Sequence, residues 1–166
     1  MGFPKLVIPL LLFLFTHPLP AISKVYIDIN APSPRKAPLA VQDFIPMEEA
    51  AGGTEAFGEI KKELDVTLSG DINFSGLFNT IGKEAYLEEP SSGITSEKTN
   101  FRLWRAIGAE FLIKGGIKIK EKTLTVEFRL FDTIGEKELF ARRYLSRPEG
   151  ARQIAHRFSD DLMELL

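Results

Sequence analysis

The chain has 166 residues, of which 44% are hydrophobic and 27% charged, and its formal net charge is −2. This charge weighs against a protein whose main task is to hold a nucleic-acid backbone, because such proteins carry a clear excess of Lys and Arg. The chain contains no cysteine, which excludes a disulfide framework, thiol catalysis and thiolate metal sites.

Residues 1–23 have the features of a secretory signal peptide. Lys5 supplies a positive start, and the apolar run 6–15 is too short to cross a bilayer core of ~30 Å. Small residues, Ala21 and Ser23, occupy both positions that a cleavage site requires. The alternative is an uncleaved membrane anchor, which the short run and Pro9 disfavour. We therefore expect an exported protein, and an exported chain without cysteine is typical of the bacterial periplasm.

Residues 24–38 begin with a strand pattern that prolines then interrupt. The apolar side chains of Val25, Ile27 and Ile29 alternate with those of Tyr26, Asp28 and Asn30, and Lys24 precedes them. Pro32, Pro34 and Pro38 follow, and none of them has an N–H group for a strand ladder. The pattern predicts an extended tail joined by a proline-rich linker to a domain at 39–166.

Alternating strand and helix patterns follow in the first half of that domain. We expect a strand at 39–44 and then an amphipathic helix with Thr54 as N-cap and Gly76 just past its end. The apolar stripe of this helix consists of Phe57, Ile60, Leu64, Leu68 and Ile72. A short strand at 77–81 and a polar, exposed loop at 83–99 should come next.

The second half shows the clearest β-pattern in the chain. Asn100 should cap a short helix that contains Trp104 and ends at Gly108. Strands at 111–119, 124–130 and 139–145 then predict an antiparallel meander with one covered face and one largely wet face. A last helix follows Pro148, with its buried stripe at Ala151, Ile154, Phe158, Leu162 and Leu165. The expected fold class is α/β or α+β: a mixed sheet flanked by two longer helices and one short helix.

The residues that usually carry chemistry form no catalytic pattern. His156 is two residues from Ile154 and therefore lies away from the buried stripe of the last helix. No cysteine or serine elbow accompanies it, so we interpret it as a solvated surface histidine. Gly115-Gly116 lacks the spacing of a phosphate-binding loop and is interpreted as a bulge or bend in a strand. We therefore expect no enzyme, no cofactor and no metal.

Charged pairs are interpreted as structural or solvating. The side chains of the adjacent pairs Glu48-Glu49, Glu88-Glu89 and Asp160-Asp161 point apart on a strand or helix, so no pair alone can hold a metal. Arg142 and Arg143 fall on opposite faces of a strand, which splits the basic-aromatic cluster that they would form with Phe140 and Tyr144. We therefore interpret this stretch as a solvent-exposed outer strand and not as a nucleic-acid-binding patch.

Several stretches together resemble the N-terminal domain of the TolB family of the Tol–Pal system. They are "DINFSGLF" at 71–78, "LWRAIGAEFLIKG" at 103–115, "EFRLFDT" at 127–133, and the tail directly after a signal peptide. The resemblance implies a mixed sheet flanked by helices, followed in the full-length family by a β-propeller that carries the Pal-binding surface. The chain ends where that propeller would begin, so Pal binding is not assigned to these residues. It also departs from the family at Asp43, where proline is usual.

The resemblance implies a role for the tail. In the family, the segment after the cleavage site is recognised by the C-terminal domain of TolA, an inner-membrane protein. The residues carried over are Lys24, Val25, Tyr26, Ile27, Asp28, Ile29 and Asn30, with Val25, Ile27 and Ile29 facing the partner. An extended segment of this kind can add a strand to an exposed sheet edge. The alternative is that the same residues form an ordinary edge strand of their own domain.

The function hypothesis is a non-enzymatic periplasmic adaptor. A periplasmic enzyme or small-ligand binder is the alternative from another class, and it would need a pocket with convergent polar groups. A nucleic-acid-binding α/β module is a further alternative, and it would bind with a steep dependence on salt.

Overall fold

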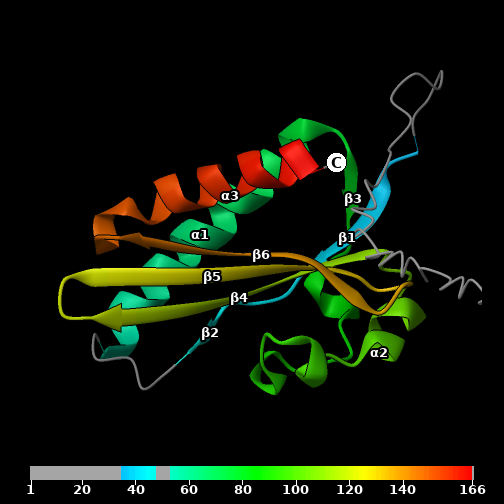
Figure 1. The fold of residues 1–166 in the computed structure, drawn as a ribbon, viewed down its shortest axis with the longest axis horizontal. Helices are drawn as coiled ribbons and strands as arrows, with labels where there is room; N and C mark the ends of the chain where they lie inside the picture. The colour runs from blue at the N-terminus through cyan, green and yellow to red at the C-terminus, as the bar shows by residue number, and fades with distance from the viewer. Residues whose placement is uncertain (1–34, 48–52, 166) are drawn as a thin grey trace, which may run out of the picture.

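The computed structural model describes residues 35–47 and 53–165, which form one mixed β-sheet with helices on both faces (Figure 1). The strands are β1 Ala37–Val41, β2 Ile45–Pro46, β3 Phe78–Thr80, β4 Phe111–Lys120, β5 Thr123–Asp132 and β6 Lys137–Ser146. The helices are α1 Gly53–Ser75, α2 Phe101–Ala106 and α3 Ala151–Leu165. This architecture confirms the predicted fold class.

The sheet has a parallel half and an antiparallel half. Its strand order is β3-β1-β4-β5-β6, and β2 pairs with β4 on the same side as β1. Strand β1 is parallel to both β3 and β4, whereas β4, β5 and β6 form the predicted antiparallel meander. Strand β1 begins at Ala37, two residues before the strand that we expected, and so includes Pro38. The Pro38 carbonyl accepts a hydrogen bond of 2.9 Å from the Glu110 N–H. The proline is tolerated because this contact uses its carbonyl and needs no N–H.

Helices α1 and α3 cover one face of the sheet (Figure 1). The predicted stripe of α1 is buried at Ile60, Leu64, Leu68 and Ile72. The helix begins at Gly53, so Thr54 lies in its first turn, and Gly76 follows its end with φ of +70°. In α3, Phe158 stacks on Phe128 of β5 with ring centroids 4.1 Å apart. The face of the sheet under both helices is therefore the main core.

A smaller core lies on the other face, under α2 and the segment 83–99. This segment contains three short 3-10 turns, η1 Lys83–Ala85, η2 Pro90–Ser92 and η3 Ser96–Lys98. Trp104 is 1% exposed and its ring lies edge-on to that of Tyr86, with centroids 4.9 Å apart. The expectation of an exposed loop was wrong for Glu88 and Thr99, which are both buried. The segment is a cover for the sheet.

The prediction of a bulge at Gly115-Gly116 was also wrong. Strand β4 runs through both glycines in regular register with β5, and the irregularity in the meander lies at Leu130/Phe131. The side chain of Phe44 fills the space above Gly115, where a Cβ would lie 2.1 Å from the Phe44 ring. Gly115 is therefore required for the close approach of an aromatic side chain.

Candidate functional site

The residues predicted to bind a partner, 24–30, lie outside the described residues, as does the pair Glu48-Glu49. The described structure begins at Arg35, so it shows the place where the tail joins the domain. The described residues therefore show the contacts that hold this attachment point and the surface of the folded body.

The attachment point consists of Ala37 and Pro38, the first two residues of β1, and backbone hydrogen bonds hold it on both sides. The Ala37 N–H donates to the Leu77 carbonyl at 3.0 Å, and on the other side the Glu110 N–H donates to the Pro38 carbonyl. The Arg35 guanidinium also pairs with the Glu110 carboxylate. The chain that precedes residue 35 is thus joined to the end of a strand with a neighbour on each side, β3 and β4.

Asp43, where the resemblance to the family leads us to expect a proline, makes ion pairs that a proline cannot make. Its carboxylate lies 3.0 Å from the Lys61 Nζ on α1 and also pairs with Lys83. Burial alone would raise the pKa of Asp43, but hydrogen bonds from Lys83 and Lys61 outweigh it and lower the pKa below its ordinary value. The local change therefore ties the segment after β1 to α1 and to η1.

Sequence reasoning missed a buried ion pair between Glu88 and Lys114. Their side chains are 5% and 1% exposed. The Glu88 carboxylate also accepts hydrogen bonds from the Trp104 Nε1, the Asn100 N–H and the Ser92 Oγ at 2.7–2.8 Å. The Lys114 Nζ also donates to the Gly93 carbonyl at 2.9 Å. This cluster fastens the 83–99 cover to β4 and α2, and its groups face one another, away from solvent.

The protonation of this cluster is set by its hydrogen bonds. Burial raises the pKa of Glu88, but the bonds from Lys114, Ser92 and Asn100 more than offset it, so the pKa lies below its ordinary value. Burial lowers the pKa of Lys114, and the neighbouring Glu88 works against this change. The two charged groups are buried and paired with each other, which indicates a structural role for the pair.

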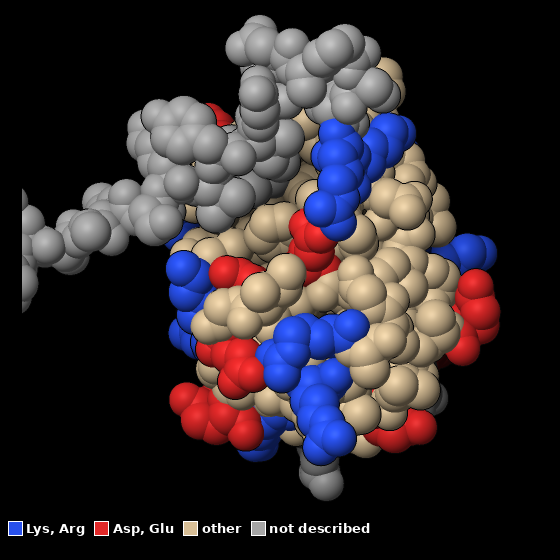
Figure 2. All heavy atoms as spheres, turned by 90° about the vertical axis from the view of Figure 1, so that its right-hand side faces the viewer, with Lys and Arg blue, Asp and Glu red and all other residues tan. Residues whose placement is uncertain are grey.

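The two arginines of β6 fall on opposite faces, as expected. Arg142 lies over the Phe140 ring and its Nε is 3.2 Å from the Asp161 carboxylate. On the other face, Arg143 pairs with Glu127 at 2.8 Å. The predicted split of the basic-aromatic cluster is confirmed. On the end of the domain seen in Figure 2, Lys and Arg side chains are likewise interspersed with Asp and Glu.

His156 is a bridge between helices. Its side chain is 45% exposed, and its Nδ1 lies 2.8 Å from the Asp71 carboxylate on α1. The Arg152 Nε lies 3.4 Å from the other ring nitrogen. Within 35–47 and 53–165, no group of three or more His, Asp or Glu residues could hold a metal ion.

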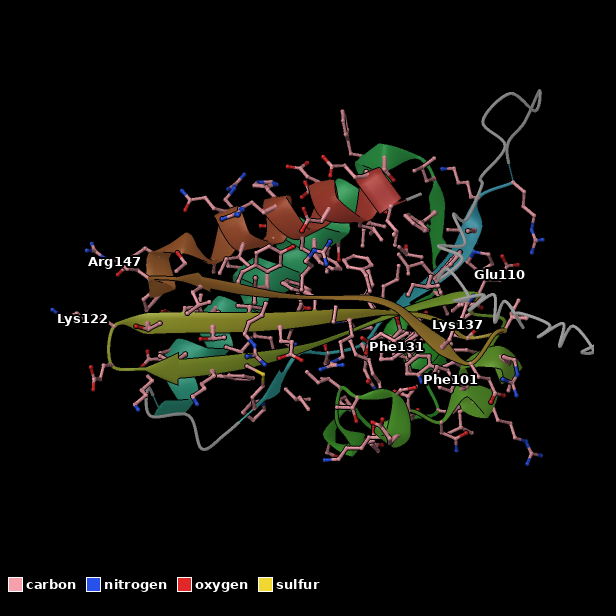
Figure 3. All side chains as sticks on the ribbon, viewed as in Figure 1. Phe101, Glu110, Lys122, Phe131, Lys137 and Arg147 are labelled. Carbon is pink, nitrogen blue, oxygen red and sulfur yellow. The ribbon has the colours of Figure 1, made fainter. Side chains whose placement is uncertain are left out.

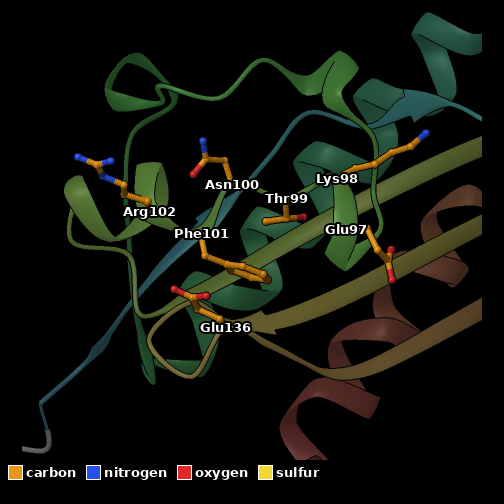
Figure 4. Close-up of a pocket in the computed structure, with 7 residues that line it drawn as sticks. All are labelled: Glu97, Lys98, Thr99, Asn100, Phe101, Arg102 and Glu136. Carbon is orange, nitrogen blue, oxygen red and sulfur yellow. The ribbon is translucent and has the colours of Figure 1, made fainter.

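A surface hollow with a volume of about 400 Å³ lies at the start of α2 (Figure 4). It is lined by Glu97, Lys98, Thr99, Asn100, Phe101, Arg102 and Glu136. Phe101 lies at its centre, and the side chains of Lys98 and Arg102 point away from it in opposite directions (Figure 4). A ligand site needs polar groups that converge on one point, and these charged groups diverge.

These observations define an α+β domain that presents strand edges and a firmly held N-terminal attachment point. The profile of the TolB amino-terminal domain matches residues 25–139, and the chain belongs to this family. Three relatives with similar sequences are each described as a Tol-Pal system protein TolB. The protein from Syntrophotalea carbinolica is 32% identical over 83% of this chain, and that from Desulfosudis oleivorans is 34% identical over 85%. The protein from Geobacter metallireducens is 33% identical over 85%.

The fold also resembles a solved TolB structure. The crystal structure of TolB from Acinetobacter baumannii matches 79% of this chain with a TM-score of 0.57 and 20% sequence identity, which supports the fold alone. The match covers 28% of that protein, and the chain spans about a third (31–32%) of the length of the three relatives. Among the described residues, no helix is both long and apolar enough to cross a membrane.

Proposed function

We propose that this chain is the tail-bearing domain of a non-enzymatic periplasmic adaptor in the Tol–Pal system. The C-terminal domain of TolA binds the tail, Lys24–Asn30, as an added strand, and the folded body serves as a mount. Through this link the protein contributes to outer-membrane integrity, protein import and cell division. Pal binds only through the propeller of longer relatives and not through these residues.

The observation that carries this proposal is the position of the tail. It follows a signal-like segment and precedes a strand, β1, that is paired on both sides. A force on the tail therefore acts along a strand held by two neighbours. The alternation of Val25, Ile27 and Ile29 gives an added strand one apolar face, and backbone hydrogen bonds supply affinity.

The alternative of a small-ligand binder or enzyme has less support. The hollow around Phe101 lacks convergent polar groups, and the buried pair Glu88–Lys114 is satisfied internally. The nucleic-acid alternative is disfavoured by the net charge of −2 and by the interspersed charges.

The test is calorimetric titration of the TolA C-terminal domain of the same organism with two forms of the protein, 24–166 and 34–166. We expect binding by the first form and none by the second. Equal binding by both would place the site on the folded body. Absence of binding by either would remove the tail proposal for this chain.

A further inference from the structure

Among residues 35–47 and 53–165, strand β6 leaves one long edge of the sheet without a partner. It is the last strand in the order β3-β1-β4-β5-β6, and the strand it pairs with is β5. In the described part of the chain, no other element forms a backbone hydrogen bond with Lys137–Ser146. The opposite edge, β3, has three residues, whereas β6 has ten. A long free edge presents a row of N–H and C=O groups to which an extended segment can bind.

The central and final parts of β6 lack two features that usually protect an edge, proline and a bulge, although they carry the charged side chains of Arg142 and Arg143. The strand contains no proline, and the irregularity at Leu130/Phe131 lies opposite its first residues. From Ala141 to Ser146 the register with β5 is regular. Proteins commonly blunt exposed edges with short strands, prolines or bulges. Six consecutive residues are therefore available in regular geometry.

The side chains of this edge indicate the chemistry of its partner. Arg142 and Arg143 are 53% and 66% exposed at the side chain. Lys137 lies at one end of β6 and Arg147 just beyond the other (Figure 3). Arg142 donates through Nε to Asp161 and through Nη1 to the Ala141 carbonyl, and Arg143 donates through two nitrogens to Glu127. Guanidinium N–H groups remain on both arginines for a further acceptor. Strand β6 itself holds three basic residues, Lys137, Arg142 and Arg143, and one acid, Glu138, in a chain of negative net charge.

The same charges oppose pairing between two copies of this chain. An antiparallel pair of β6 strands, centred on the regular stretch, would bring arginines of the two copies close together. Like charges across two strands destabilise their pairing. An acidic strand would meet the arginines favourably, and the exposed Leu145, 68% exposed, offers it an apolar contact.

We propose that the outer edge of β6 is the docking site for an extended acidic segment of a partner protein, which adds a seventh strand to the sheet. Backbone hydrogen bonds to Ala141–Ser146 hold the segment, and carboxylates on its two faces meet Arg142 and Arg143. In this interaction the domain accepts a strand, whereas through its tail it donates one.

The probe is an acetylated, amidated heptapeptide with the repeating pattern valine-glutamate-glutamate, which places carboxylates on both faces of an extended strand. It is added to isotope-labelled protein 24–166 and followed by NMR, and we expect amide shifts and slowed hydrogen exchange along β6. The same peptide with lysine in place of glutamate should bind with an affinity at least about fivefold lower. A version N-methylated at its three central amides lacks donors on both edges and should not bind. No binding at millimolar peptide, shifts away from β6, or equal binding of the N-methylated peptide would each overturn the proposal.

A matched pair of variants tests the charges. R142Q/R143Q should weaken binding of the glutamate peptide about fivefold, and K62Q, on the exposed face of α1, should leave it unchanged. If the double variant does not fold, R142Q alone keeps the Arg143–Glu127 pair and is used instead. Unchanged affinity in a folded arginine variant would overturn the acidic-partner assignment.

Discussion

At the scale of single residues, Gly115 shows how one missing side chain fixes a packing arrangement. The Phe44 ring occupies the place of its Cβ and lies edge-on to Phe128, with centroids 5.3 Å apart. We predict that Gly115→Ala lowers the free energy of unfolding by about 1–3 kcal/mol, because the buried Phe44 must shift. Urea denaturation followed by tryptophan fluorescence measures the change.

Gly70 provides the contrast, because nothing lies within 4 Å of the Cβ that it lacks. It sits on the exposed side of α1, where alanine is favoured over glycine by about 1 kcal/mol. Gly70→Ala should therefore stabilise the domain by up to about this amount. A loss of stability in this variant would contradict the exposed helical position described for Gly70, and no loss in Gly115→Ala would contradict the packing described for Phe44.

One half of the Glu88–Lys114 pair leaves a signal in the sequence. Lys114 interrupts the apolar run Phe111–Ile117, and a fully buried lysine is almost always paired. Its partner could not be predicted, because Glu88 lies 26 residues away in a segment with no periodic pattern. Periodicity reports which face of an element is buried, but not which distant side chain it meets.

At the scale of elements, that pair holds the 83–99 cover on the sheet. We predict that Glu88→Ala lowers the free energy of unfolding by about 3–5 kcal/mol, because it leaves the buried Lys114 charge without its partner. Adding Lys114→Met to Glu88→Ala should recover a large part of this loss. Denaturant unfolding of both variants tests this, and hydrogen exchange should show the single variant opening first across 83–99.

The same pair predicts the acid behaviour of the cover. The pKa of Glu88 in the folded state lies below its ordinary value of 4.5, so the unfolded state binds more protons in acid. The stability from this group is present above pH 4.5 and is lost as the pH falls through the lower, folded pKa. Between about pH 5 and pH 3, Glu88→Ala/Lys114→Met should therefore lose less stability than the parent chain. An identical loss in both would contradict the assignment.

The elements with strong periodicity were predicted well. The burial of the 83–99 segment and the close contact between Phe44 and Gly115 were not predicted. The stripes of α1 and α3 and the three-stranded meander follow from spacings of about 3.6 and 2 residues. The burial of 83–99 and the reason for Gly115-Gly116 depend on contacts with residues far along the chain. Composition alone indicates a polar, exposed loop at 83–99 and a bulge or bend at Gly115-Gly116.

At the scale of the whole molecule, a folded body carries a tail to which we assign the function. If the tail is free, removal of residues 24–33 should leave the melting temperature of the domain within about 2 °C of that of 24–166. If the tail is an ordinary edge strand of its own domain, its removal should lower the melting temperature by several degrees, because about 1 kcal/mol corresponds to 2–8 °C in domains of this size. Scanning calorimetry on the two forms separates the alternatives.

The family and its fold follow from the comparisons, and the motifs of the sequence had indicated both. The partner site, 24–30, remains a prediction, because it lies outside the described residues. A test of this site must distinguish strand addition, in which the two faces of the tail have different roles, from non-specific binding by apolar or charged residues.

The most direct measurement is the dissociation constant of the TolA C-terminal domain for two matched variants of 24–166. One replaces Val25, Ile27 and Ile29 by serine, and the other replaces Tyr26, Asp28 and Asn30 by serine. Capture of the tail by strand addition predicts that the first variant loses at least about a hundredfold in affinity, since three apolar side chains leave their pockets, and that the second loses less than about tenfold. Equal losses in the two variants, or a larger loss in the second, would contradict strand addition with the apolar face toward the partner.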